Sequence, residues 1–264
     1  MKKQLSFIRF NAPLMLSMLF FTGIFFSCDK DDASQVVPDE EASLESNEEL
    51  IKFLESTDFE GKNIVFEDGI FVIDGDILIS KEEVELYATQ TKPSAGNEKT
   101  DHWRSYYLVS NNYVSNITVY IESSVPSSWK TATRNAMSQW NAINGTRLYF
   151  SETSNRNAAL IRVNTGYSNQ NWVAQAYLPF YNGRPGNLMT INTRYNSLSS
   201  GMKLFTMVHE MGHTFGFYHT DQSQGIFIPG TPSVDANSVM NSYVLPWNGF
   251  TNGDIDAVQI MYPQ

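Results

Sequence analysis

The apolar positions of residues 47–92 predict a small module of short helices and strands. Residues 47–56 place leucine, isoleucine and phenylalanine side chains on one helical face. Residues 63–80 alternate apolar runs with two Asp-Gly pairs, at 68–69 and 74–75, and this alternation is typical of β-hairpins.

A second helix is expected in the same module. Ser80 and Glu83 have the spacing of a capping box ahead of residues 81–90, which predicts that a helix begins there. A module of this length buries too little apolar area to fold alone, so we expect it to pack against the chain that follows. Residues 91–100 contain proline, glycine and serine and predict a linker.

Residues 101–264 predict one larger α+β domain. The apolar positions of residues 127–143 recur at helical spacing and include two tryptophans. Two further helices are expected at 200–216 and 253–262, the second with Thr251 and Asp254 as its capping pair. Strands are expected at 115–123, 146–152, 158–164, 172–179 and 186–193.

The N-terminus predicts an export signal, with residues 1–27 as a lipoprotein signal peptide. Three basic residues precede the apolar residues 12–26, and Cys28 follows as the expected lipidation site. A membrane-spanning helix would need about 20 apolar residues, and this run is shorter and interrupted. The residues before Cys28 depart from the usual small-residue pattern of a lipoprotein cleavage site. Residues 28–46 are polar and acidic and predict a flexible tether.

Composition narrows the classes of partner. The net charge of −10 is accounted for by residues 28–60, which hold 12 acidic and two basic residues. The rest of the chain is therefore nearly neutral. No basic surface that could bind nucleic acid is expected. Cys28 is the only cysteine, which excludes an intramolecular disulfide and a cysteine-built metal site. The sequence leaves the oligomeric state open.

Three of the four histidines lie within eleven residues, in the sequence HEMGHTFGFYH. His209 and His213 are four apart on an expected helix, so both imidazoles face one side, and Gly216 allows a sharp turn that returns His219 to the same point. Three imidazoles around one Zn²⁺ leave a fourth position for water, as in catalytic zinc sites. Glu210 is placed to act as general base toward that water.

His102 and Asp221 are the two other residues with side chains suited to a metal site or its surroundings. His102 stands alone in a linker-like context and is expected to be an ordinary surface residue. Asp221 could accept a hydrogen bond from a ligand imidazole or cap its own loop, and both alternatives stay open. The wall of the cleft is expected from residues 226–235 and from the residues around Tyr243.

The histidine motif, together with Met240 in the sequence SVMNSY, resembles the metzincin metalloproteases, and most closely the small bacterial dual-action metalloprotease family. The resemblance implies a metzincin-like fold: a twisted, mostly parallel sheet with an antiparallel edge strand, an active-site helix, a Met-turn under the metal and a C-terminal helix. Residues 172–179 resemble that edge strand. Gln175 replaces a histidine that binds structural zinc in matrix metalloproteinases, so one zinc ion and none of their calcium sites are expected.

Tyr243 departs from the family pattern. Astacin-like and serralysin-like members have a tyrosine two residues after the methionine, where it stabilises the oxyanion, and here it comes three residues after. Its two alternatives are an oxyanion-stabilising role and a tyrosine of the core or rim.

The sequence therefore predicts a zinc-dependent endopeptidase that binds an extended protein substrate antiparallel to residues 172–178. The alternative is a surface-anchored binding or adhesion lipoprotein that keeps this fold without turnover. A third hypothesis treats residues 47–92 as a latency segment, with Asp74 or Asp76 at the open zinc position, although turn formation explains both residues more simply.

The expected location is the bacterial outer membrane, with a lipid at Cys28 and possible display on the cell surface, since the acidic residues after Cys28 resemble surface-export signals. Replacement of the only acceptor thiol in Cys28→Ser should move the protein from the membrane fraction to the soluble fraction, as measured by fractionation and labelling with a fatty-acid analogue. Unchanged membrane association and labelling would contradict lipidation at Cys28.

Overall fold

The computed structural model describes residues 46–90, 102–222, 225–232 and 235–264, all within one compact unit. The expected signal peptide, Cys28 and nearly all of the tether lie outside the described residues. Within them, no helix combines the length and the apolar character needed to cross a membrane.

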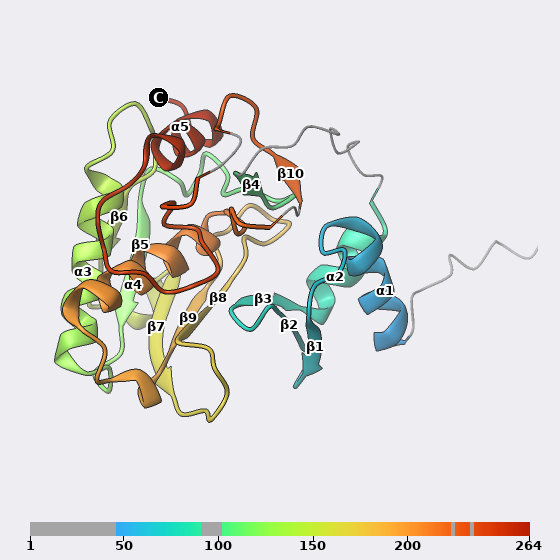
Figure 1. Cartoon of the computed structure of the whole chain (residues 1–264), viewed down its shortest axis with the longest axis horizontal. Helices are drawn as coiled ribbons and strands as arrows, with labels where there is room; N and C mark the ends of the chain where they lie inside the picture. The colour runs from blue at the N-terminus through green and yellow to red at the C-terminus, as the bar shows by residue number, and fades with distance from the viewer. Residues whose placement is uncertain (1–45, 91–101, 223–224, 233–234) are drawn as a thin grey trace, which may run out of the picture. The chain divides into compact units, whose positions relative to one another are not determined.

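An eight-stranded mixed sheet forms the centre of the fold, in the order β1-β2-β3-β8-β9-β7-β5-β6 (Figure 1). Four of its strand pairs are parallel (β3-β8, β9-β7, β7-β5 and β5-β6) and the other three are antiparallel. The strands are β1 (Ile64–Glu67), β2 (Ile70–Ile73), β3 (Ile77–Ser80), β5 (Ile117–Ile121), β6 (Phe150–Glu152), β7 (Ile161–Gly166), β8 (Ala174–Tyr177) and β9 (Leu188–Asn192). The α+β class with a mixed sheet is as the sequence predicts.

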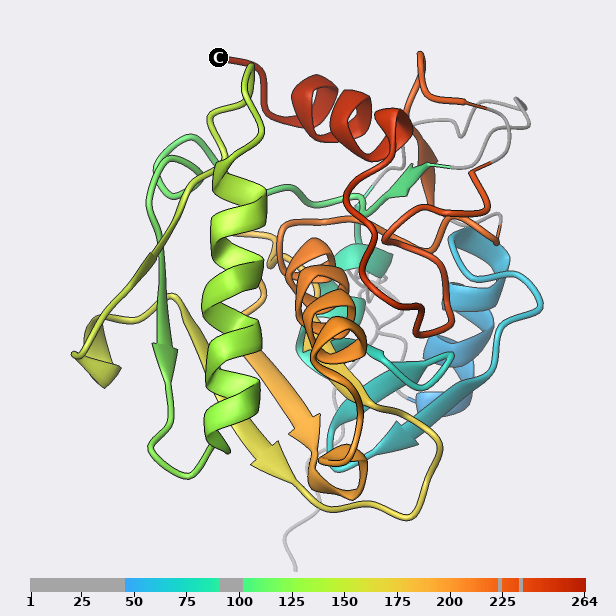
Figure 2. The same ribbon diagram turned by 60° about the vertical axis from the view of Figure 1, so that its left-hand side comes forward.

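Two long helices, α3 (Ser127–Asn141) and α4 (Ser200–Thr214), lie side by side against the sheet (Figure 2). Alternate residues of β5 are buried, which places one face of that strand in the main hydrophobic core. Trp140 of α3 is fully buried and its Nε1 donates a hydrogen bond to the carbonyl oxygen of Val208, at 3.1 Å. This contact fixes α3 against the helix that carries the histidine motif.

The N-terminal module contains α1 (Asn47–Thr57), the β1-β2-β3 meander and α2 (Lys81–Ala88), as the sequence predicts. Asp68 and Gly69 both have positive φ, at 49° and 81°, and form a two-residue hairpin turn between the paired Glu67 and Ile70. Asp74 and Gly75 also have positive φ, at 51° and 96°, but the connection from Ile73 to its partner Ile77 has three residues and includes Asp76. The module does not have a core of its own. A second hydrophobic cluster joins its apolar residues to four residues from the rest of the chain: Trp103, Leu178, Tyr218 and Phe227.

The module also extends the sheet beyond β8. β8 is antiparallel to β9, as expected, but its other side is paired in parallel with β3. Residues 172–179 were expected at the edge of the sheet, and the edges of the eight-stranded sheet are instead β1 and β6. The strand that was expected to receive a substrate is therefore covered by a strand of the same chain.

Two local expectations are corrected, and one strand pair was not predicted. Ser80 caps α2, but the Glu83 carboxylate accepts the backbone N–H of Tyr181 at 2.9 Å and so does not complete the capping box. α3 ends at Asn141, before Ile143. The pairing of two short strands, β4 (Trp103–Arg104) and β10 (Ile226–Phe227), was not expected because each has only two residues.

The last helix, α5 (Asn252–Met261), begins with the predicted capping box of Thr251 and Asp254. Asp254 is fully buried and accepts three further contacts, from the Ser238 hydroxyl at 2.6 Å, the Val239 N–H at 3.1 Å and His102 Nε2 at 3.3 Å. One carboxylate thus ties α5 to the turn before Met240.

Replacement of this carboxylate in Asp254→Ala should lower the free energy of unfolding by about 3 kcal/mol, because it leaves several buried donors without an acceptor. The melting temperature should fall by roughly 6–12 °C in differential scanning calorimetry. Asp256→Ala removes an exposed carboxylate from the same helix and serves as the control. An equal effect of the two substitutions would contradict the assigned role of Asp254.

Candidate metal centre and catalytic site

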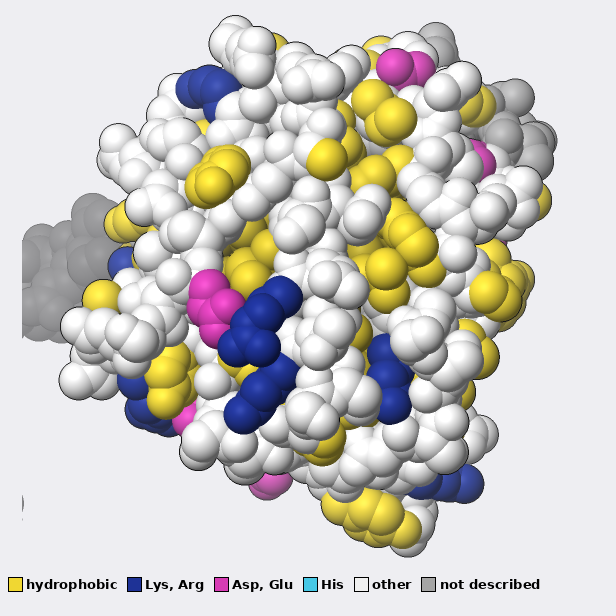
Figure 3. All heavy atoms as spheres, turned by 90° about the vertical axis from the view of Figure 1, so that its left-hand side faces the viewer, with side chains coloured by type: hydrophobic (Ala, Val, Ile, Leu, Met, Phe, Trp, Pro, Cys, Tyr) yellow, Lys and Arg dark blue, Asp and Glu magenta, His cyan; other side chains and the backbone are white. Residues whose placement is uncertain are grey.

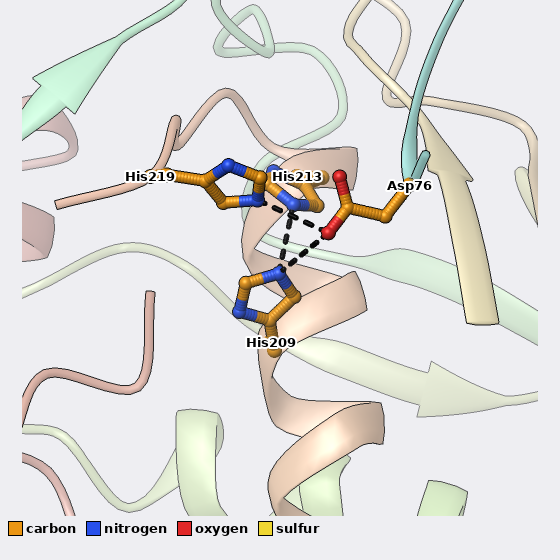
Figure 4. A group of neighbouring side chains, drawn as sticks. All are labelled: Asp76, His209, His213 and His219. Atoms are coloured by element: carbon orange, nitrogen blue, oxygen red, sulfur yellow. Dashed lines mark hydrogen bonds and ion pairs between the residues drawn. The ribbon is translucent and has the colours of Figure 1, made fainter. Parts of the chain in front are cut away.

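Three imidazoles converge on one point at the C-terminal half of α4 (Figure 4). His209 and His213 lie one turn apart on α4, and His219 follows the end of the helix. The three histidines are nearly or completely buried. Their ring nitrogens and one carboxylate oxygen of Asp76 lie within 4.8 Å of one another. The structure thus brings together the three histidines that the sequence predicted as ligands.

Hydrogen bonds of the two helical histidines fix their tautomers. Nδ1 of His209 lies 2.8 Å from the carbonyl oxygen of Val239, and Nδ1 of His213 lies 2.8 Å from that of Phe217. A carbonyl oxygen can only accept, so both Nδ1 atoms carry a hydrogen. Burial, with the neighbouring His209 and His219 imidazoles, lowers the pKa of His213 well below its usual value, so its ring is neutral.

The two Nε2 atoms that remain face each other at 3.0 Å. In neutral rings of these tautomers both atoms are lone-pair acceptors, and such a contact is repulsive unless a cation lies between them. Zn–N bonds of about 2.0–2.1 Å in a tetrahedron place ligand atoms about 3.3–3.4 Å apart. The distance from His213 Nε2 to His209 Nε2 is 3.0 Å, and Asp76 Oδ2 lies 3.1 Å from His219 Nε2 and 3.6 Å from His209 Nε2, so these four atoms fit a tetrahedral metal ion.

His219 reaches this point because the chain turns at Gly216. Gly216 has φ +114°, and a Cβ there would lie 2.9 Å from Leu108 Cδ2, so a larger residue is excluded. Backbone bonds then hold both neighbours of His219: Tyr218 N–H donates to the Trp103 carbonyl and Thr220 N–H to the Met240 carbonyl, both at 2.9 Å.

Met240 lies in the turn beside the histidines, where the sequence placed it. The side chain of Met240 is fully buried. A Cβ at Gly212 would lie 2.4 Å from Met240 Sδ, so the thioether packs directly on the α4 backbone between His209 and His213. Met240 thus contacts the helix that carries the histidines.

His102 is not an ordinary surface residue. It is fully buried and contacts Asp254, which holds the Ser238–Val239 turn. No local pattern in the sequence predicts this contact, because His102 and Asp254 are 152 residues apart.

Glu210 lies next to the first histidine on α4 and is 2% exposed. Its Oε2 has no hydrogen-bond partner among the described residues, and burial together with Asp76 raises its pKa well above the usual value. A buried acceptor without a partner is costly in a native structure unless it serves a ligand or water. Glu210 therefore has a free oxygen beside the histidine cluster.

Asp76 adds a fourth group that the sequence analysis attributed to turn formation. Its Oδ2 lies 3.1 Å from His219 Nε2 and 3.6 Å from His209 Nε2 (Figure 4). Burial acts to raise the pKa of Asp76, but the imidazoles outweigh it and the pKa lies well below its usual value. Asp74 does serve the turn, since its Oδ1 accepts the Asn63 N–H at 3.1 Å.

Asp221 caps a loop and does not contact a ligand imidazole. Its carboxylate accepts the N–H and the hydroxyl of Ser242, at 3.0 and 2.6 Å, whereas Nδ1 of His219 has no partner among the described residues. Tyr243 is 64% exposed and its side chain hydrogen-bonds to Asp221. In this structure Tyr243 is a rim residue.

A cavity of about 500 Å³ lies in front of His209 and Glu210. Its described lining residues come from the N-terminal module, from residues 170–174, from α4 and from residues 241–244. Residues 226–235 were expected to form part of this wall, but none of those described lines it. Gln175 does not line this cavity either. Its Nε2 donates a hydrogen bond to the Gly75 carbonyl at 2.8 Å, which ties β8 to the N-terminal module.

No histidine side chain is seen on the face of the molecule in Figure 3, where basic and acidic side chains lie next to one another. Two ion pairs near the surface, Arg134–Glu152 and Arg156–Glu122, both have 2.8 Å contacts.

This fold and this site define a metzincin-like metallopeptidase. The family model described as the dual-action HEIGH metallopeptidases matches residues 71–225, more than half of the chain, and the chain belongs to that family. In this chain the five residues 209–213 read HEMGH, with Met211 in the place of the isoleucine. The matched range begins in β2 and includes Asp76.

Similarities to solved structures are distant. One structure of myroilysin is 15% identical to this chain, and the match covers 57% of this chain and 81% of that one. A second structure of myroilysin is 14% identical, and the match covers 66% of this chain and 98% of that one. Both have a TM-score of 0.41. High choriolytic enzyme 1, a hatching-enzyme zinc protease from the medaka fish Oryzias latipes, is 15% identical with a TM-score of 0.39 over 66% of this chain and 98% of its own. A comparison with curated proteins gives no match.

Metal binding should stabilise the fold through these histidines. A free metal concentration a thousand times the Kd should raise the free energy of unfolding by about 4 kcal/mol, visible as a higher melting temperature with metal than with chelator. His213→Asn should lose most of that difference, with each variant compared with itself. The same metal-dependent increment in both proteins would contradict ligation by His213.

Proposed function

We propose that this metallopeptidase is a zinc-dependent endopeptidase of extended protein substrates, with His209, His213 and His219 as the metal ligands. The observation that supports the proposal most directly is the pair of Nε2 atoms, of His209 and His213, that face each other at 3.0 Å beside a buried, unpartnered glutamate oxygen. All-imidazole ligation suits zinc among the abundant divalent ions.

Bound zinc would polarise the scissile carbonyl and lower the pKa of the attacking water to about 7. Glu210 Oε2 takes the proton of that water, because it is the unpartnered acceptor next to the histidines. The raised pKa of Glu210 then suits the return of the proton to the leaving amine. Met240 keeps the helix backbone rigid beneath these groups and is not a ligand.

Tyr243 takes part only through a movement of its side chain. In the structure its hydroxyl bonds to Asp221, and the residue lines the cavity with a largely exposed ring. A rotation that releases Asp221 would bring the hydroxyl toward a substrate oxyanion. The rim position and the oxyanion role are therefore two states of one residue in this proposal.

An extended peptide would pair with β8 by main-chain hydrogen bonds, as in strand addition to a sheet edge. This requires the backbone groups of β8 that β3 occupies in the structure. We also propose, from the sequence alone, that a lipid on Cys28 attaches the enzyme to the bacterial outer membrane.

The role of Glu210 is tested by Glu210→Gln and Glu210→Ala. Both should bind metal as the wild type does, but cleave a quenched fluorescent peptide library at least about 10²-fold more slowly, because neither side chain can accept the proton. Metal content is the control, and a chelator should abolish wild-type cleavage. Undiminished cleavage in the metal-loaded variants would contradict the role of Glu210 as general base.

A further inference from the structure

Among the described residues, a second group of potential metal ligands lies at the start of α5, apart from the histidines of the catalytic centre. The group consists of His102, Asp235 and Asp254, whose three donor atoms lie within 4.8 Å of one another. His102 and Asp254 are fully buried, and the side chain of Asp235 is 9% exposed. Three segments that are far apart in the sequence therefore meet at one buried polar point.

The distances within this group are long for hydrogen bonds. His102 Nε2 lies 3.3 Å from Asp254 Oδ1 and 3.7 Å from Asp235 Oδ2. A charge-assisted N–H···O bond is about 2.7–2.9 Å long, and one ring N–H cannot point at two carboxylates at once. Zinc bonds of about 2.0–2.2 Å to nitrogen and oxygen place the ligand atoms about 3.3–3.6 Å apart at tetrahedral angles. The observed spacing is closer to that of ligands around a metal ion.

The second ring nitrogen of His102 favours a neutral ring. His102 Nδ1 is buried and has no hydrogen-bond partner among the described residues. Both nitrogens of an imidazolium ion carry hydrogen, so an ion pair with Asp254 would leave a charged N–H donor buried without an acceptor. A metal ion on Nε2 leaves the ring itself neutral, which reduces this cost.

The two carboxylates of the group repel each other. Burial, together with the charge of Asp254, raises the pKa of Asp235. A divalent cation between the carboxylates balances both negative charges while the imidazole stays neutral. Zinc takes imidazole and carboxylate ligands, whereas calcium and magnesium prefer oxygen ligands alone.

Gly253 leaves room for the close approach of these side chains. A Cβ at Gly253 would lie 2.5 Å from both Asp235 Oδ2 and His102 Cε1. The backbone of Gly253 does not have a positive φ, so its conformation does not require glycine. Alanine would favour the helix by about 1 kcal/mol relative to glycine. The glycine is therefore explained by the packing of the two side chains and not by the path of the backbone.

We propose that His102, Asp235 and Asp254 form a second metal site, which binds a zinc ion. This ion is additional to the one held by the three histidines, and its site does not depend on the proposed function. A water or the hydroxyl groups of Ser238 and Thr251, each hydrogen-bonded to one of the two carboxylates, can complete the coordination.

The ion would stabilise the turn that orients His209. Asp254 Oδ2 accepts the Val239 N–H at 3.1 Å, and the Val239 carbonyl oxygen lies 2.8 Å from His209 Nδ1. The carbonyl oxygen of His102 accepts the Ile228 N–H at 3.0 Å, beside the paired strands β4 and β10. The second ion thus joins α5, this turn and β4, and its role is structural.

The assignment is tested by the zinc content of the full-length chain, measured by mass spectrometry after equilibration with buffered zinc. The wild type should hold two ions per chain, and Asp235→Asn and His213→Asn one each, because each substitution removes a ligand from a different site. Asp235→Asn keeps an acceptor for the Thr251 hydroxyl. Asp256→Asn removes an exposed carboxylate from α5 and should hold two ions.

Two ions in Asp235→Asn would overturn the second site. A single ion in the wild type that is lost in His213→Asn would also overturn it and leave the proposed function standing. A single ion lost only in Asp235→Asn would support the second site and contradict the ligands of the proposed function, and a wild type without zinc would contradict both.

A second measurement does not depend on the folding of Asp235→Asn. X-ray absorption at the zinc edge of His213→Asn should show one imidazole, with oxygen atoms as the other ligands. Two or more imidazoles around the remaining zinc, or no bound zinc in this variant, would overturn the assignment.

Discussion

The structure depends on one constraint, that the Nε2 atoms of His209 and His213 point at each other from 3.0 Å. Each ring is locked by an Nδ1–H bond to a backbone carbonyl, of Val239 or of Phe217, so neither ring can rotate its lone pair away without losing that bond. The resulting repulsion is relieved by a cation, and the folding free energy of the surrounding chain must hold the rings in place until one binds.

Several distant parts of the chain meet this requirement together. Trp140 anchors α4 to α3, and Met240 packs on Gly212 between the two ligating positions. Asp254 holds the turn that supplies the Val239 carbonyl, and is itself contacted by His102. The main hydrophobic core thus orients the imidazoles of His209 and His213 through backbone carbonyls. A substitution far from the histidines can therefore change the orientation of an imidazole.

The N-terminal module makes two kinds of contact with the rest of the chain through one hairpin. The Asp74–Gly75 turn sets the direction of β3, β3 pairs with β8, and Asp76 between them reaches the histidines. These contacts come from adjacent residues of one hairpin. The cluster around Phe59 and Tyr218 also links the module to the segment of His219.

The sequence by itself determined most features that depend on local spacing, and the capping box of Ser80 and Glu83 failed because a distant residue, Tyr181, takes the Glu83 carboxylate. The helical positions of His209, His213 and Glu210, the turn at Gly216, the two Asp-Gly hairpins and the capping box of α5 all follow from residues within one or two turns of each other. Only the tertiary structure decided which distant segments meet. The cover of β8 by β3, the approach of Asp76 to His219 and the burial of His102 against Asp254 join residues about 100 to 150 positions apart. No periodicity records such pairs, because they arise from the packing of whole elements and not from the conformation of any one of them.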